Sequence, residues 1–220
     1  MINCCIFDLD GTLLNTIPSI THYINETFRK RGFAAISEED TRRFIGNGAS
    51  KLIERALRSV GAYSEDVHPE VLRSYNAAYD SDPYYLTEPY RGIPELVSDL
   101  KERRVALAVL SNKPHSTTEL CVRHFFGDSF DFILGGKDGV PLKPAKESTE
   151  TVLRTLGKLP SATAFIGDSD VDIITGRNAG VALTLGCAWG FRGKEELLRA
   201  GAVIVADTPR AAHKVLLEKL

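Results

Sequence analysis

Two clusters of aspartates follow apolar segments of the sequence. Asp8 and Asp10 end the segment that begins at Ile2, and Asp168, Asp170 and Asp172 follow the segment Thr163–Ile166. Carboxylates that lie close together repel each other unless a cation neutralises them or one of them holds a proton. Oxygen ligands from two segments, with no His or Cys among them, favour a hard octahedral cation such as Mg²⁺ over zinc. We therefore expect a metal site that acts together with a phosphorylated ligand.

Each acidic cluster also has a purely structural interpretation. Asp10 precedes Gly11, so the first cluster could be a solvated turn that bends the chain. Asp170 could simply begin a helix, because an acidic side chain in the first turn suits the helix dipole. That explanation is weaker for Asp168, which directly follows the apolar segment and its Gly167.

Residues that could bind an anion follow two further segments. Ser111 and Asn112 come after Val105–Leu110 and offer a hydroxyl and an amide ahead of an expected helix. The same pair could form an ordinary turn. Lys143 lies just before a helix expected to begin near Glu147, where a cation opposes the helix dipole. A phosphate counter-charge would account for this lysine, although a solvated side chain would also be tolerated.

The segments that carry these residues alternate between strand and helix patterns. Short apolar runs without polar alternation predict strands buried on both faces, and periodic stretches between them predict helices. The expected strands are Ile2–Leu9, Val105–Leu110, Phe130–Leu134, Thr163–Ile166, Val181–Leu185 and Val203–Val205. The expected helices are Pro94–Arg103, His115–Phe126, Glu147–Leu156, Asp170–Ala179, Lys194–Ala200 and Arg210–Lys219. This order predicts an α/β fold with a doubly wound, Rossmann-like parallel sheet, whose ligands bind at the carboxyl edge.

One long segment does not follow this alternation. Residues 16–87 show only helical periodicity, with helices expected near Ile20–Phe28, Leu52–Val60 and Pro69–Tyr79. The segment is far longer than a connection from a strand to a helix needs. We therefore expect a core formed by residues 1–15 and 88–220, and an inserted all-helical domain formed by residues 16–87.

Composition and charge exclude several classes of protein. The chain has 27 basic and 29 acidic residues, so it lacks the basic excess of a nucleic-acid binder. No apolar run approaches the ~20 residues of a membrane span, and the N-terminus does not have the pattern of a signal peptide. The four cysteines, two of them adjacent, form no disulfide framework. We expect a cytoplasmic protein that binds a small phosphorylated metabolite, and neither nucleic acid nor a membrane.

Four short motifs, taken in order, resemble those of the haloacid dehalogenase superfamily. They are Asp8–Leu14 (DLDGTLL), Ser111-Asn112, Lys143-Pro144 and Gly167–Asp172 (GDSDVD), and the resemblance extends over the whole chain. The helical insertion is similar to the C1-type cap of this superfamily. Within it, the chain most resembles the phosphoglycolate phosphatases, through the segments Phe44–Gly48 and Trp189–Gly193.

This resemblance implies catalytic roles for the acidic residues. Asp8 would be the nucleophile that forms an aspartyl phosphate, and Asp10 would be the general acid and base. Asp8, the backbone carbonyl of Asp10 and Asp168 would hold Mg²⁺, while Asp172 would orient a ligand or Lys143. Because a halide leaves without a proton, the second aspartate, Asp10, argues for phosphoryl transfer rather than dehalogenation.

The resemblance also implies binding roles. Ser111, Asn112 and Lys143 would bind the phosphate group. In the insertion, Gly46, Asn47 and Gly48 would recognise a carboxylate of the substrate, although this segment could be a plain turn between helices. The sequence departs from the family pattern at Asn15, where an aspartate is usual, and at Lys146, where a second proline would be expected two residues after Pro144. Lys146 is therefore a rival to Lys143 for the phosphate.

The resemblance leads to one leading function and several alternatives. The leading hypothesis is a Mg²⁺-dependent phosphatase for a small phosphomonoester, with 2-phosphoglycolate as the first candidate. The same aspartyl phosphate would serve a sugar-phosphate mutase of the β-phosphoglucomutase kind, and a pyrophosphatase has a similar fold. A non-catalytic sensor of phosphorylated metabolites is the alternative outside the enzymes.

Overall fold

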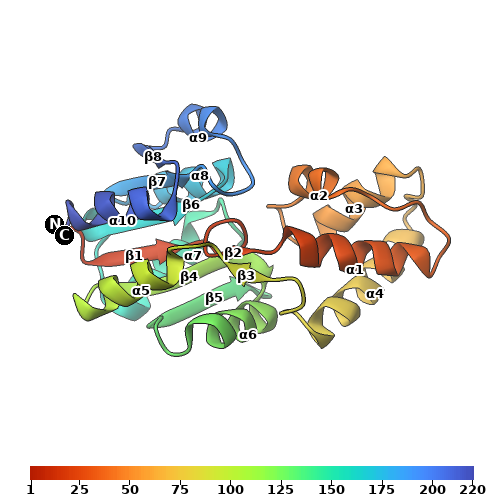
Figure 1. Cartoon of the computed structure of the whole chain (residues 1–220), viewed down its shortest axis with the longest axis horizontal. Helices are drawn as coiled ribbons and strands as arrows, with labels where there is room; N and C mark the ends of the chain where they lie inside the picture. The colour runs from red at the N-terminus through yellow and green to blue at the C-terminus, as the bar shows by residue number, and fades with distance from the viewer. The chain divides into compact units, whose positions relative to one another are not determined.

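The computed structural model describes all 220 residues and contains a six-stranded parallel sheet (Figure 1). Its strands are β1 (Cys4–Phe7), β4 (Ala106–Pro114), β5 (Phe132–Gly136), β6 (Thr163–Gly167), β7 (Leu183–Cys187) and β8 (Ile204–Ala206). The spatial order is β5-β4-β1-β6-β7-β8, and every neighbouring pair is parallel. The chain thus builds outward from β1 in both directions, which confirms the predicted α/β fold with a doubly wound parallel sheet.

Burial on both faces explains why the strands lack polar alternation. Successive side chains of β1 point to opposite faces of the sheet, as in any strand. Cys5 and Phe7 join one apolar cluster, whereas Cys4 and Ile6 join another on the opposite face. Both clusters exclude water, so each position of the strand favours an apolar residue.

Six helices accompany this sheet. They are α5 (Ile93–Glu102), α6 (His115–Phe126), α7 (Lys146–Leu156), α8 (Asp170–Asn178), α9 (Lys194–Ala200) and α10 (Pro209–Leu217). Residues of α5, α6 and α10 belong to the cluster on one face of the sheet, and residues of α7 belong to the cluster on the other. All six occur close to their predicted bounds, because their caps and apolar faces are local signals. Thr208, for example, caps α10 by accepting a hydrogen bond from the backbone N–H of Ala211.

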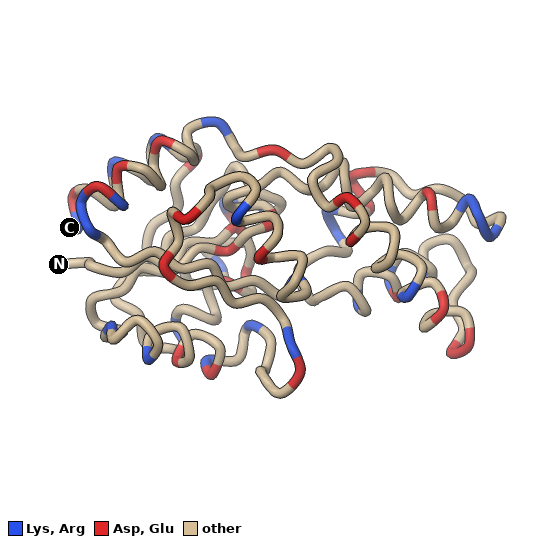
Figure 2. Tube along the Cα trace, turned by 90° about the horizontal axis from the view of Figure 1, so that it is seen from below, with Lys and Arg blue, Asp and Glu red and all other residues tan.

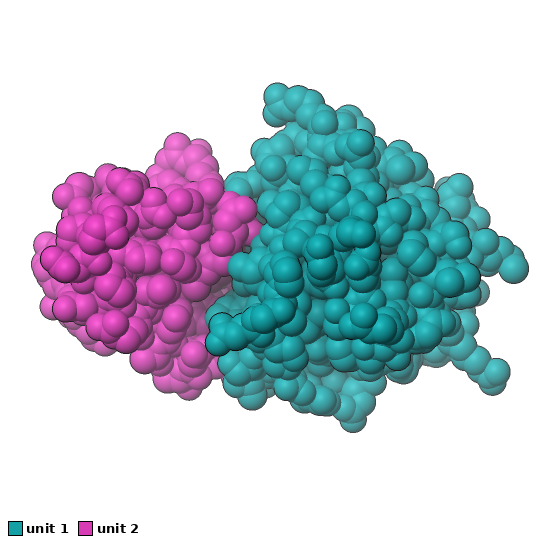
Figure 3. Space-filling model, turned by 180° about the vertical axis from the view of Figure 1, so that it is seen from behind, with its two compact units in different colours: residues 1–15, 89–220 teal, residues 16–88 magenta.

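The chain divides into two compact units (Figure 3). Unit 1 consists of Met1–Asn15 and Pro89–Leu220 and contains the six-stranded sheet. Unit 2 consists of Thr16–Glu88 and contains α1 (Ile17–Arg29), α2 (Glu38–Phe44), α3 (Ala49–Ser59) and α4 (Val67–Ser81). The four helices of unit 2 have an apolar core of their own.

Some local structure was not predicted. Helix α2 is short and mostly charged, and Thr41 is its only buried residue, so it shows no apolar periodicity. A capping box between Ser37 and Asp40 begins it instead. Two strands, β2 (Leu14–Asn15) and β3 (Glu88–Pro89), form a separate two-stranded sheet and are too short to show a pattern.

Charged residues of both signs are intermixed along the chain (Figure 2). Lys and Arg are mixed with Asp and Glu on most helices, as expected for a formal net charge of -2. None of the helices combines the length and the apolar character that crossing a membrane would require.

Candidate active site

The strand order brings the predicted motifs together at one edge of the sheet. Strand β1 lies between β4 and β6, and both pairings are parallel. The segments that follow β1 and β6, and the last residues of β4, therefore meet at the carboxyl edge. Asp8 directly follows β1, Asp168 directly follows β6, and Ser111 lies within β4.

Three carboxylates converge at this edge. Asp8, Asp168 and Asp172 each place one carboxylate oxygen within 4.8 Å of the others, and we call these residues the acidic triad. Asp8, Asp168 and Asp172 are 9%, 1% and 0% exposed, so water screens the repulsion between their carboxylates poorly. All three side chains of the triad offer carboxylate oxygens as ligands, and a hard divalent cation prefers oxygen ligands.

Lys143 supplies one positive charge to the acidic triad. Its Nζ lies 2.8 Å from Oδ1 of Asp8 and 2.7 Å from Oδ1 of Asp172, and the lysine is only 5% exposed. The nearby Lys146, the rival in the sequence, is instead exposed and pairs with Glu150 one turn along α7. The structure thus brings Lys143, and not Lys146, to the acidic triad.

Burial and mutual repulsion raise the pKa of two carboxylates of the triad. Burial, followed by repulsion from Asp172, raises the pKa of Asp8 to about 7, while Lys143 acts in the opposite direction. Burial, followed by repulsion from Asp172 and Asp8, also raises the pKa of Asp168. Burial by itself would lower the pKa of Lys143, but attraction to Asp172 and Asp8 outweighs burial and raises it. Protons relieve the repulsion here, and a divalent cation would relieve it more fully, so the residues present fit such a cation.

The loop after β1 fits closely around Asp168. The Oγ1 hydroxyl of Thr12 donates to Oδ1 of Asp168 at 3.1 Å. Gly11 has a φ of 87°, and a Cβ at this position would lie 2.3 Å from Oδ2 of Asp168. Both the backbone conformation and the close approach therefore require glycine after the second aspartate.

Asp10 lies outside the acidic triad and has a different partner. Nζ of Lys113 is 3.3 Å and 3.4 Å from the two carboxylate oxygens of Asp10. The two side chains are 7% and 15% exposed, respectively. No role for Lys113 was predicted from the sequence. Lys113 directly follows Ser111-Asn112 in the sequence. The predicted strand ended at Leu110, whereas β4 continues to Pro114 and carries Lys113 to the loop after β1.

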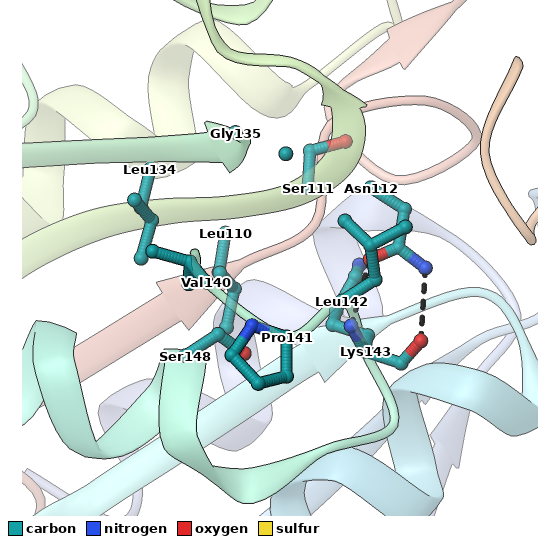
Figure 4. A pocket seen from close by; sticks show the side chains of 11 residues that line it. Leu110, Ser111, Asn112, Leu134, Gly135, Val140, Pro141, Leu142, Lys143 and Ser148 are labelled. Carbon is teal, nitrogen blue, oxygen red and sulfur yellow. Dashed lines mark hydrogen bonds between the residues drawn. The ribbon is translucent and has the colours of Figure 1, made fainter. Parts of the chain in front are cut away.

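The predicted phosphate-binding residues lie around one cavity (Figure 4). Ser111, Asn112 and Lys143 line this cavity together with Ser148 and mostly apolar residues. The side chain of Asn112 makes two hydrogen bonds with the backbone of Lys143, one as donor and one as acceptor. Its Nδ2 donates to the carbonyl oxygen at 3.0 Å, and its Oδ1 accepts from the N–H at 2.8 Å. Asn112 thus holds the loop that carries Lys143, a role that the sequence did not predict.

Asp170 and Asp172 both lie in the first turn of α8, but only Asp172 belongs to the acidic triad. Asp170 is the first residue of α8, as its structural interpretation predicts, and it is not part of the triad. Asp172 uses Oδ2 to accept hydrogen bonds from the N–H and hydroxyl of Ser169, at 3.0 Å and 2.6 Å, which completes a capping box. Its Oδ1 binds Lys143, so the start of α8 fixes one side of the triad.

The predicted recognition loop of unit 2 has a defined conformation. Gly46 and Gly48, with φ of 115° and 84°, flank Asn47 between α2 and α3. Arg55 of α3 donates from Nη1 to the carbonyl oxygen of Phe44 at 2.7 Å and from Nη2 to Oδ1 of Asn47 at 2.8 Å. Arg55, for which the sequence predicted no role, therefore ties the loop to helix α3.

The chain is similar to known proteins in sequence and in fold. A family model described as haloacid dehalogenase-like hydrolase matches residues 5–185. The phosphoglycolate phosphatase of Vibrio parahaemolyticus is 29% identical over 92% of this chain and 90% of its own, and that of Aquifex aeolicus is 31% identical over 84% of each. A crystal structure from Lactobacillus delbrueckii subsp. bulgaricus superposes with a TM-score of 0.91 at 31% identity, covering 97% of this chain and 98% of the other. The chain belongs to the haloacid dehalogenase-like hydrolase family.

Proposed function

We propose that this protein is a Mg²⁺-dependent phosphatase that hydrolyses a small phosphomonoester, with 2-phosphoglycolate as the first candidate substrate. The observation that carries the proposal is the buried acidic triad with Lys143 bridging Asp8 and Asp172. A buried excess of carboxylates destabilises a fold, and it has a use where a cation and a phosphate are to be held. The phosphoglycolate phosphatases of Vibrio parahaemolyticus and Aquifex aeolicus support the choice of substrate.

Asp8 and Asp10 divide the chemistry between them. A carboxylate oxygen of Asp8 attacks phosphorus, the bond from phosphorus to the ester oxygen breaks, and Asp10 gives a proton to the leaving alkoxide. In the second step Asp10 takes a proton from the water that attacks the aspartyl phosphate, which releases phosphate and restores Asp8. Their positions, two residues apart at the end of β1, allow both to serve one substrate.

The remaining residues hold the charges in place. Asp8, Asp168 and the backbone carbonyl of Asp10 would bind Mg²⁺, and Asp172 orients Lys143. When bound, Mg²⁺ supplies positive charge to the phosphoryl oxygens. Ser111, Asn112 and Lys143 would bind the remaining phosphate oxygens, which makes the catalysis largely electrostatic.

Unit 2 has the place of a C1-type cap in this proposal, with unit 1 as the catalytic core. The loop Gly46, Asn47 and Gly48 would offer backbone N–H groups to the substrate carboxylate, and Arg55 keeps that loop in shape. All four cysteines are free thiols, which suits a reducing compartment such as the cytoplasm.

A substrate panel tests the proposed function. Phosphate release is measured with and without Mg²⁺ for 2-phosphoglycolate, sugar phosphates, nucleotides and pyrophosphate. We expect Mg²⁺-dependent release, fastest from 2-phosphoglycolate, and a loss of at least about 10³-fold in kcat for Asp8→Asn. Asp170→Asn is the matched control, because Asp170 lies outside the triad, and it should keep its activity.

Other outcomes of the panel would replace the proposal. Isomerisation of a hexose phosphate with little phosphate release would identify a mutase. Preferential cleavage of pyrophosphate would identify a pyrophosphatase. Tight binding of a phosphorylated metabolite without turnover, unchanged in Asp8→Asn, would identify a sensor.

A further inference from the structure

The segment Trp189–Phe191, which follows β7, contacts the loop after β1 and the acidic triad. Nε1 of Trp189 donates a hydrogen bond to the carbonyl oxygen of Thr12 at 3.1 Å. The N–H of Phe191 donates to Oδ2 of Asp168 at 2.8 Å in a buried contact. These residues contribute to the family resemblance, but the proposed mechanism gives them no role.

Gly190 brings the backbone of this segment directly against Asp168. A Cβ at position 190 would lie 2.3 Å from Cβ of Asp168 and 2.4 Å from the carbonyl oxygen of Gly11. Real Cβ atoms do not approach other atoms so closely, so a side chain here would have to displace Asp168 or the loop after β1. The segment therefore fits against Asp168 only because residue 190 is glycine.

Hydrogen bonds from the loop after β1 and from the segment Trp189–Phe191 surround the carboxylate of Asp168. Oδ1 of Asp168 accepts from the hydroxyl of Thr12, and Oδ2 accepts from the N–H of Phe191. Trp189 in turn bonds the backbone of Thr12. Each carboxylate oxygen has a second lone pair, so these donors fix the orientation of Asp168 and still leave acceptor capacity for a cation.

We propose that the segment Trp189–Phe191 is a positioning element that fixes the carboxylate of Asp168 for binding a divalent cation. The inference rests on the proposed function in so far as Asp168 is a metal ligand. The segment acts through Asp168 and Thr12. Donors that orient a metal ligand reduce the freedom that the ligand loses on binding, and their removal typically weakens metal affinity about 10–100-fold.

Calorimetric titration of the full-length protein with Mg²⁺ tests this inference without measuring turnover. We expect Gly190→Ala to weaken Mg²⁺ binding by at least about tenfold, because the new methyl group displaces Asp168. Trp189→Phe keeps most of the ring but loses the Nε1–H donor, and should weaken binding about three- to tenfold. Gly193→Ala is the matched control in the same loop. The nearest atom to its new Cβ is Oε2 of Glu195 at 3.6 Å, so Mg²⁺ affinity should be unchanged.

The outcomes separate this inference from the proposed function. If the wild-type protein neither binds Mg²⁺ nor hydrolyses phosphomonoesters, the proposed function fails and the inference fails with it. If the wild type does both, but Trp189→Phe and a folded Gly190→Ala bind Mg²⁺ with unchanged affinity, only the positioning role is overturned. Far-UV circular dichroism in EDTA establishes folding, and Trp189→Phe alone decides the matter should Gly190→Ala unfold. An equal loss of affinity in Gly193→Ala would also contradict a specific role of Gly190.

Discussion

Lys113 and Asp10 form an ion pair across the carboxyl edge of the sheet, although 103 positions separate them in the chain. Nζ of Lys113 is nearly equidistant from the two carboxylate oxygens, at 3.3 Å and 3.4 Å. Both side chains are largely buried, so the pair restricts the orientation of the carboxylate that the proposed mechanism uses for proton transfer. Parallel pairing of β1 with β4 makes this contact possible.

Replacement of Lys113 by methionine should reduce turnover more than substrate binding. Asp10 would lose the cation that fixes its carboxylate, and we expect kcat to fall about 10–100-fold with KM changed by less than about threefold. Lys113→Arg, which keeps a charged donor, should recover part of the activity. Steady-state phosphate release checks both variants, with the exposed Lys146→Met as control. A raised KM with normal kcat would show instead that Lys113 binds the substrate.

Removal of Lys143 should destabilise the metal-free protein strongly. Lys143→Met leaves the acidic triad without its cation, and breaking a buried ion pair in this way typically costs about 3–5 kcal/mol. The loss should be larger near pH 8 than near pH 5, because burial raises the pKa of Asp8 to about 7 and this carboxylate is therefore protonated at the lower pH. Urea unfolding in EDTA measures the effect. An equal destabilisation at both pH values would contradict this account of the triad.

Binding of Mg²⁺ should weaken as the pH falls below about 7, where Asp8 takes up a proton. Burial raises the pKa of Asp8 above its unfolded value of 3.8, so the metal-free folded state binds more protons than the unfolded chain between these values. The contribution of Asp8 to the stability of the metal-free protein therefore decreases as the pH rises through that range. Because Mg²⁺ must displace the proton, its apparent affinity should fall up to about tenfold per pH unit on acidification. Calorimetry at several pH values tests this, and a pH-independent affinity would contradict it.

Loosening the loop of unit 2 should change substrate preference. Arg55→Met removes the hydrogen bonds to Phe44 and Asn47. We expect KM for 2-phosphoglycolate to rise about tenfold, with less than about a twofold effect on an aryl phosphate that has no carboxylate. Arg58→Met is the matched control, because Arg58 lies on the same helix, is exposed and pairs with Glu54 rather than with the loop. An equal loss for both substrates would mean that the loop does not read the carboxylate.

Much of the fold could be predicted because its signals are local. Burial on both faces makes β1, β6 and their neighbours apolar runs, and caps such as Thr208 mark where helices begin. Helix α2 was missed because a capping box and surface charges, not an apolar stripe, determine it. The sequence left Lys146 as a rival to Lys143, which lies in a motif directly before Pro144. The structure brings only Lys143 to the acidic triad, and phosphate binding by Lys143 stays a prediction.

By itself, the sequence predicted which residues could carry chemistry and placed them near the ends of strands. Asp8, Asp168, Ser111 and Lys143 were identified from residue type and position, without knowledge of their neighbours. Tertiary structure decided which of them meet. Local periodicity specifies how a segment is buried but not which strands are neighbours, so the placement of β1 between β4 and β6 cannot be read from it.

Partners from distant segments depend on that placement. Lys113 reaches Asp10 because β4 pairs with β1 and then continues past the end of β1. Asn112 holds Lys143 across 31 positions of the chain. Trp189 bonds Thr12 across 177 positions, because the segment after β7 returns to the same edge of the sheet. The sequence determined the chemistry that is available to this protein. Long-range packing decided which charges pair, because contact energies between segments depend on distances that no local pattern records.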